Sequence, residues 1–176
     1  MDIKLILPTA EYEEQVMALR SELFSDEESF AGCSGLNVAE SYAEWLDHKA
    51  LTEKMYGENN VPSDVFLAVR ESDNRVVGII DCRYVLSDFL LKYGGTTGYT
   101  VRRDERRKGY AAEMLRQVCG IAREHGAERV LVTCDRENEA SRRTILRCGG
   151  VLENEVPDDV GMGWSGTLQR YWIELK

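Results

Sequence analysis

The chain has 176 residues, 43% of them hydrophobic, which is enough for one domain with a buried core and leaves little room for a second, so we expect a single domain over residues 1–176. With 31 acidic against 22 basic residues, the formal net charge of -9 disfavours a broad surface for nucleic acid, whose phosphates such a field repels. The apolar runs are shorter than the roughly 20 residues of a membrane helix, and the N-terminus lacks a signal-peptide pattern. We therefore expect a cytoplasmic protein without a membrane or nucleic-acid partner.

The first half of the chain predicts one strand, two helices and a hairpin of strands. Pro8-Thr9 followed by acidic residues is a typical helix start, because carboxylates in a first turn face the positive end of the helix dipole. Apolar residues at helical spacing, among them Tyr42 and Trp45, predict the second helix. In chain order we expect a strand at residues 3–7, helices to about residue 24 and over 39–54, and strands over 65–69 and 76–84.

The second half predicts alternating strands and helices. Met114, Leu115 and Val118 share one face of a helix that Gly126 should end in a left-handed conformation. The expected elements are strands at 98–102, 130–134, 151–155 and 170–175, and helices at 111–124 and 138–147. The order β-α-α-β-β-β-α-β-α-β-β predicts an α/β (α+β) domain with a mixed central sheet flanked by helices.

The five cysteines are widely spaced and odd in number, with no C-x-x-C pair and no histidine at a metal-ligand distance in sequence. This pattern is typical of buried thiols in a reducing compartment, and it predicts no metal site. They are Cys33, Cys82, Cys119, Cys134 and Cys148.

A short basic segment, VRRDERRKGYAAEML at residues 101–115, lies where the predicted strand passes into the predicted helix. Gly109 allows the backbone to approach a ligand closely, and the helix that follows directs free N–H groups and its positive dipole end toward the loop. We interpret this arrangement as a site for an anion. It lacks the G-K-[ST] of a Walker loop and the further glycines of a dinucleotide-binding loop. A solvated run of charge is the alternative.

The segment from Arg106 to Ala111, RRKGYA, resembles the acetyl-CoA pyrophosphate loop Q/R-x-x-G-x-G/A of the GNAT superfamily of N-acetyltransferases. Val101 before the loop, Asn138 at the start of the next helix and Gly149 eleven residues later follow the order of that family. The stretches GGTTGYTVRRDERRKGYAAEML, CGGVLENEV and RYWIEL are also similar to a poorly characterised bacterial subgroup of predicted acetyltransferases. The resemblance covers roughly residues 65–176 and implies a mostly antiparallel central sheet.

The resemblance implies that acetyl-CoA is the cosubstrate and that an amine attacks its acetyl group directly. A bulged strand would direct backbone amides to the pantetheine arm and the thioester carbonyl, and the loop backbone would bind the pyrophosphate, with the side chains of Arg106 and Lys108 at its rim. Asn138 would contact the pantetheine or acyl region, although helix capping explains it equally well. The implied cofactor-binding residues are Tyr99, Val101, Arg106, Arg107, Lys108, Gly109, Tyr110, Ala111, Ala112 and Asn138.

The groups that would move protons are less evident. Many members of the family carry, seven residues after the asparagine, a tyrosine that protonates the leaving thiolate, but Ile145 stands at this position and cannot donate a proton. Asp81 and Tyr171 are the catalytic candidates, because they lie on strands expected near the acceptor. Asp81 could instead form an ion pair with Arg83, two residues along the same strand face.

The acceptor is expected to be a small-molecule or peptide amine, and a homodimer is possible. Between Glu11 and Glu28 there are seven carboxylates and only Arg20 in opposition, which could form a negative mouth for a cationic amine or a solvated acidic face. A non-catalytic acyl-CoA sensor on the same fold is the alternative function. A nucleic-acid-binding module is disfavoured by the overall acidity and by the lack of aromatic residues among the basic ones.

Overall fold

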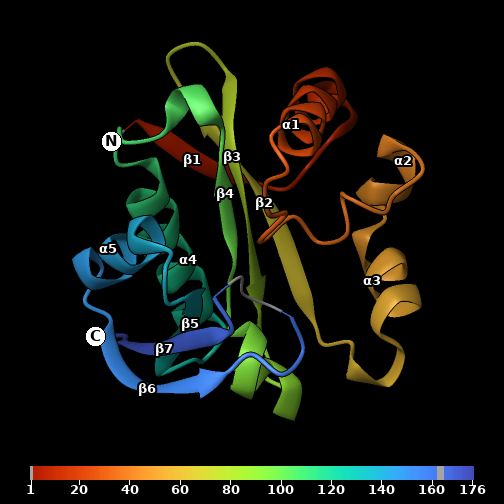
Figure 1. The fold of residues 1–176 in the computed structure, drawn as a ribbon. Coiled ribbons are helices and arrows are strands. Elements are labelled where there is room, and N and C mark those ends of the chain that lie inside the picture. The colour runs from red at the N-terminus through yellow and green to blue at the C-terminus, as the bar shows by residue number, and fades with distance from the viewer. Residues whose placement is uncertain (1, 162–164) are drawn as a thin grey trace.

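The computed structural model describes residues 2–161 and 165–176, which fold into strands flanked by helices (Figure 1). The strands are β1 (Ile3–Ile6), β2 (Ser63–Arg70), β3 (Arg75–Arg83), β4 (Tyr99–Val101), β5 (Arg129–Asp135), β6 (Val151–Pro157) and β7 (Thr167–Glu174). The α-helices are α1 (Glu13–Ser25), α2 (Tyr42–Leu46), α3 (His48–Tyr56), α4 (Tyr110–Glu124) and α5 (Glu139–Arg147). Helices α4 and α5 lie on one side of the strands β1 to β4, and α1 to α3 lie on the other (Figure 1).

The strands form two antiparallel sheets, one in the order β1-β2-β3-β4 and the other in the order β5-β7-β6. The predicted α+β class is therefore confirmed, although the strands divide between two sheets. The single helix predicted over residues 39–54 is wrong, because Asp47 leaves the helical conformation with φ -89 and ψ 52. Its carboxylate accepts a hydrogen bond from the N–H of Ala50 at 3.4 Å, which begins α3 as a separate helix.

Strands β2 and β3 separate two clusters of buried apolar side chains. Phe66 and Ile80 pack with residues of α4, whereas Val65, Leu67 and Ile79 pack with residues of α1, α2 and α3. The alternation follows from the strand period of two, which sends successive side chains to opposite faces of a sheet. Because both faces are covered, these two strands appear in the sequence as nearly continuous apolar runs. Within the described ranges, no helix has the length and apolarity needed to cross a membrane.

The two sheets meet at Thr96, shortly before β4. The N–H of Thr96 donates to the carbonyl of Leu131 on β5 at 2.7 Å, and its Oγ1 accepts from the N–H of Leu131 at 3.0 Å. Gly95, with φ 69, passes so near that a Cβ there would lie 2.7 Å from the Leu131 carbonyl oxygen. Beyond this contact β4 pairs with β3 and β5 pairs with β7, so among the described strands none pairs with the outer edge of β4.

Candidate functional site

The outer edge of β4 presents the backbone amides of Tyr99 and Val101. On either side of them, the carbonyl of Gly98 accepts a hydrogen bond from β3 at 3.2 Å, and the N–H of Arg102 donates to β3 at 2.9 Å. Because bonded and non-bonded residues alternate in an antiparallel pair, the amides of Tyr99 and Val101 point away from β3. The register with β3 is unbroken over the three residues of β4, so the bulge implied by the resemblance is wrong for this pairing.

The loop between β4 and α4 turns through two residues in the left-handed region. Arg107 has φ 62 and Gly109, which precedes α4, has φ 91. The first hydrogen bond of the helix runs from the N–H of Glu113 to the carbonyl of Gly109 at 3.2 Å. Within the described part of the chain, no group accepts a hydrogen bond from the N–H groups of residues 107–112. These donors, at the positive end of the α4 dipole, are available to an anion.

Most of the basic side chains between residues 102 and 108 form ion pairs with carboxylates. Arg107 is exposed and forms no ion pair with a described residue. The ion pairs are Arg102 with Glu22 at 3.0 Å, Arg103 with Asp26 at 2.8 Å, Arg106 with Glu28 at 2.7 Å and Lys108 with Glu105 at 2.9 Å. The structure therefore places the side chains of Arg106 and Lys108 against carboxylates, where sequence reasoning expected them at the rim of a phosphate.

The acidic residues near the end of α1 are the partners of this basic segment. Arg106 donates two hydrogen bonds to Glu28, at 2.7 and 3.0 Å, and this contact holds the pKa of the Glu28 carboxyl below its ordinary value. Glu22 and Asp26 are likewise engaged by arginines. These three carboxylates do not add to a negatively charged entrance for a cationic amine, because arginines balance their charge within the fold.

Asn138 and Asp81 have defined partners. The Oδ1 of Asn138 accepts from the N–H of Ser141 at 3.0 Å and so caps α5, while a contact with the cofactor stays a prediction. Asp81 is 3% exposed and accepts from Arg83 at 2.6 Å and from the N–H of Gly98 at 2.7 Å. Burial raises the pKa of Asp81, although Arg83 opposes the shift. The alternative of an Asp81–Arg83 ion pair is confirmed.

Tyr171 of β7 and Ile145 of α5 lie in the apolar core that also contains the buried residues of α4. The Tyr171 hydroxyl donates to Gln169 at 2.7 Å, and burial raises its pKa. Tyr171 and Asp81 belong to different sheets, and their hydrogen-bond partners among the described residues are not shared. The side chain of Ile145 is fully buried and offers no proton.

Sequence reasoning missed Ser141, which lies one helical turn before Ile145 on the same face of α5. Its Oγ is 2.9 Å from the hydroxyl oxygen of Tyr99, so two hydroxyl groups bridge β4 and α5. Burial raises the pKa of the Tyr99 hydroxyl above its ordinary value. The spacing of four residues from Ile145 was the only signal in the sequence that could have pointed to Ser141.

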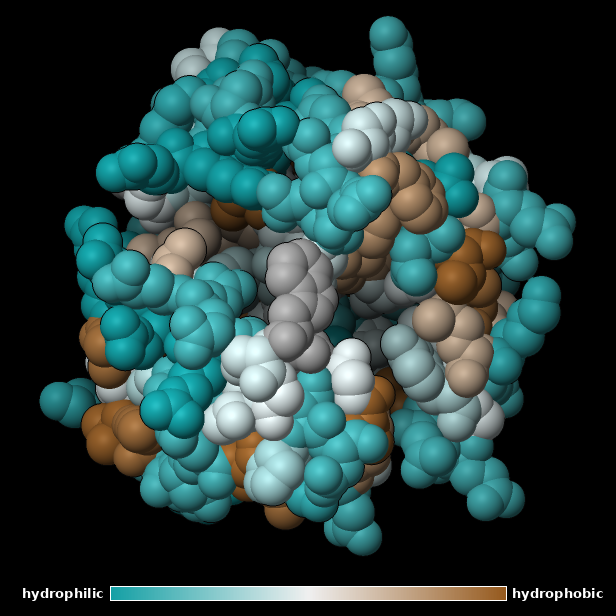
Figure 2. Space-filling model, viewed as in Figure 1, coloured by the Kyte–Doolittle hydropathy of each residue, from teal (hydrophilic) through white to brown (hydrophobic). Residues whose placement is uncertain are grey.

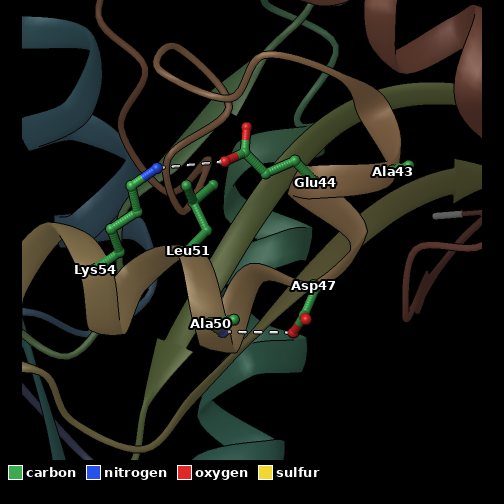
Figure 3. Close-up of a pocket in the computed structure, with 6 residues that line it drawn as sticks. All are labelled: Ala43, Glu44, Asp47, Ala50, Leu51 and Lys54. Carbon is green, nitrogen blue, oxygen red and sulfur yellow. Dashed lines mark hydrogen bonds and ion pairs between the residues drawn. The ribbon is translucent and has the colours of Figure 1, made fainter.

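Two cavities lie away from the loop. One of about 280 Å³ lies between α2 and α3, where Lys54 and Glu44 form an ion pair at 3.8 Å (Figure 3). The other, of about 290 Å³, lies between α4 and the end of β7. Neither cavity is lined by a residue from 101 to 112. The face of the molecule shown in Figure 2 is hollowed near its centre. The candidate site is thus defined by its backbone geometry rather than by either cavity.

An α+β fold with free amides at a strand edge and at a helix start is the class of arrangement that can bind an anion between the two. The sequence matches the family model described as acetyltransferase (GNAT) domain over residues 4–151, and the chain therefore belongs to the GNAT acetyltransferase family. The resemblance inferred from the loop is confirmed. No curated protein sequence matches the chain significantly.

Solved structures of acetyltransferases share the fold. The microcin C7 self-immunity acetyltransferase MccE, in complex with acetyl-CoA and AMP, has a TM-score of 0.69 and 16% identity, with 98% of this chain and 92% of that chain covered. RimL, a ribosomal L7/L12 α-N-protein acetyltransferase in complex with coenzyme A, has a TM-score of 0.70 and 14% identity, with 99% and 95% covered. The ribosomal-protein-S5-alanine acetyltransferase from Vibrio fischeri has a TM-score of 0.64 and 12% identity, with 100% and 94% covered. At these identities the likeness shows the fold alone.

Proposed function

We propose that the protein is an acetyl-CoA-dependent N-acetyltransferase that transfers the acetyl group to a primary amine by direct attack. The observation that carries this proposal is the set of unbonded N–H groups of residues 107–112 at the start of α4, beside the outward amides of Tyr99 and Val101. The first set matches a pyrophosphate, and the second set matches the amides of a pantetheine arm. Family membership supports the same cosubstrate.

In this reaction the loop backbone, from Arg107 to Ala112, would bind the pyrophosphate, and Arg107 would add a free positive charge. The amides of Tyr99 and Val101 would hold the pantetheine and polarise the thioester carbonyl. The amine nitrogen would form the new bond to the acetyl carbon while the carbon–sulfur bond breaks, and the amine would release its proton to water. A thiol with a pKa of about 8.5 leaves as thiolate without an obligatory acid. The hydroxyls of Tyr99 and Ser141 are candidates for donating a proton to it.

The acceptor belongs to the class of amines, and its identity is open between a small molecule and a peptide. RimL and the Vibrio fischeri enzyme are named for ribosomal proteins, whereas MccE is named for self-immunity. A non-catalytic acyl-CoA sensor is the second candidate, and the burial of Ile145, Asp81 and Tyr171 favours it because none of the three is free to move a proton. The ion pairs of the basic segment weigh against nucleic-acid binding.

The test of the cofactor site is a thermal-shift measurement with acetyl-CoA. We expect acetyl-CoA to raise the melting temperature of the wild type, corresponding to about 2.7 kcal/mol at a hundredfold excess over Kd. Gly109→Asp should abolish the shift, because a Cβ and a carboxylate would enter the path of the phosphates. The matched control is Gly126→Asp, at the other end of α4 with φ 88, which should lower the melting temperature and keep the shift.

Two outcomes would contradict the proposal. A full shift in Gly109→Asp would place the cofactor elsewhere. Binding of acetyl-CoA without release of free thiol, measured across a panel of polyamines, amino acids, aminoglycosides and peptide N-termini, would favour the sensor.

A further inference from the structure

Glu105, at the start of the loop, is a buried carboxylate surrounded by cations. Its side chain is 3% exposed, and its Oε2 accepts from Arg70 and from Lys108, both at 2.9 Å. Its Oε1 lies 3.3 Å from Arg75. Burial favours the protonated form, but hydrogen bonds from Lys108 and Arg70 outweigh it and hold the pKa of Glu105 below its ordinary value.

These contacts attach both ends of the loop to the hairpin of β2 and β3. Arg70 is the last residue of β2 and Arg75 is the first residue of β3. Arg70 also donates to the hydroxyl of Tyr110 at 3.2 Å, and Tyr110 is the first residue of α4. Three loop residues are therefore held: Glu105 by Arg70 and Arg75, Tyr110 by Arg70, and Lys108 through Glu105.

The held residues bracket the two left-handed positions of the loop. Arg107 lies between Glu105 and Lys108, and Gly109 lies between Lys108 and Tyr110. A residue other than glycine in this region costs roughly 1–2 kcal/mol, so a loop released from its contacts would relax toward other conformations. Relaxation would turn the N–H groups of residues 107–112 away from one another. The arrangement of these donors thus depends on side-chain contacts between the loop and the hairpin.

Resting on the proposed function, we propose that Glu105 is a positioning residue of the cofactor site. It holds the loop in the conformation in which the amides converge on the pyrophosphate, and it draws Lys108 toward the hairpin rather than toward the phosphates. Glu105 itself touches no substrate. It acts through the backbone of the loop.

The test compares Glu105→Gln with Asp73→Asn. Asp73 binds the same Arg70, at 2.6 Å, but forms no hydrogen bond or ion pair with the described residues of the loop, so its variant controls for the loss of an ion pair of Arg70. Affinity for acetyl-CoA is measured by titration calorimetry well below the melting temperature of each variant. We expect Glu105→Gln to bind about tenfold more weakly or worse, because small misplacements of binding groups cost this much. Its KM for acetyl-CoA should rise with kcat unchanged, and Asp73→Asn should match the wild type.

Hydrogen exchange gives a second measurement that needs no ligand. In Glu105→Gln the amides of residues 106–112 should exchange faster than in Asp73→Asn and in the wild type. Should Glu105→Gln fail to fold, Glu105→Asp takes its place, since it keeps the charge and shortens the reach to Lys108, and it should show the same losses to a smaller degree.

The outcomes separate this proposal from the proposed function. Unchanged affinity in the folded Glu105 variant would overturn the positioning role, whatever its melting temperature, because Glu105 would then serve the fold alone. If the wild type itself binds no acetyl-CoA, the proposed function fails. In that case faster exchange of residues 106–112, confined to the Glu105 variant, still supports the positioning role, and unchanged exchange overturns it.

Discussion

Arg107 combines two properties that oppose each other. Its φ of 62 is unfavourable for a side chain that has a Cβ, and glycine would occupy this position with less strain. Its guanidinium is exposed and forms no ion pair with the described residues, whereas carboxylates engage the neighbouring basic side chains. Strain of this kind is typical of functional positions, and here it keeps one positive charge beside the free amides.

Substitutions at Arg107 should separate the strain from the charge. Arg107→Gly removes both and should stabilise the fold by about 1 kcal/mol, the relieved strain less the extra backbone entropy that glycine loses on folding, while weakening the binding of acetyl-CoA. Arg107→Ala removes the charge and keeps the strain, so it should weaken acetyl-CoA without stabilising the fold. Urea denaturation and calorimetry measure the two effects. Equal stability of the two variants, or undiminished affinity in either, would contradict this account.

At the scale of elements, the connection between α1 and α2 packs directly against β4. The hydroxyl of Thr100 donates to the carbonyl of Ala31 at 2.8 Å, and Arg106 bonds Glu28 in the same connection. Gly32 lies so near Gly98 that a Cβ on Gly32 would be 2.0 Å from the Gly98 carbonyl oxygen. The connection between α1 and α2 therefore contacts both β4 and the loop between β4 and α4.

A pair of glycine substitutions tests this packing. Gly32 and Gly57 both have positive φ, 74 and 53, but a Cβ on Gly57 would meet nothing within 4 Å. Gly57→Ala should cost about 1–3 kcal/mol from backbone strain alone, because φ 53 with ψ -125 is a conformation that residues with a Cβ rarely adopt. Gly32→Ala should cost at least about 2 kcal/mol more, because the clash is with backbone that must shift. Chemical denaturation gives both values, and similar costs for the two variants would mean that the connection does not lie on β4.

For the whole molecule, the paired carboxylates determine how stability depends on pH. Cations lower the pKa values of Glu28, Asp73 and Glu105 in the folded chain, whereas burial raises that of Asp81. A lowered folded pKa contributes stability that is present above the unfolded value of about 4 and is lost as the pH falls through the folded value. A raised folded pKa has the opposite sign, because the folded state then binds the proton more readily.

We therefore expect the free energy of unfolding to decrease as the pH falls below about 4 to 5. Glu105→Gln should reduce this dependence, and Asp81→Asn should increase it, because it removes the one opposing group of the four. Urea denaturation at a series of pH values measures the slopes. A slope for Glu105→Gln as steep as that of the wild type would show that Glu105 titrates alike in the folded and unfolded chain.

Local signals in the sequence determined most of the elements and the family. Gly126 ends α4 in the left-handed region as predicted, with φ 88, because this conformation depends on one residue and its neighbours. The loop was found in the same way, since a basic run, a glycine and a helix start are adjacent in the chain. The break at Asp47 was missed, because apolar spacing continues through it.

Only the tertiary structure decided which charges are free and which are paired. Arg106 and Glu28 are 78 residues apart, and Arg70 and Glu105 are 35 apart, so no local pattern shows that they meet. The sequence predicts the side chains of Arg106 and Lys108 at the phosphates and gives the side chain of Arg107 no role. The fold brings carboxylates to Arg106 and Lys108 and leaves Arg107 exposed, because ion pairing depends on which distant segments pack together.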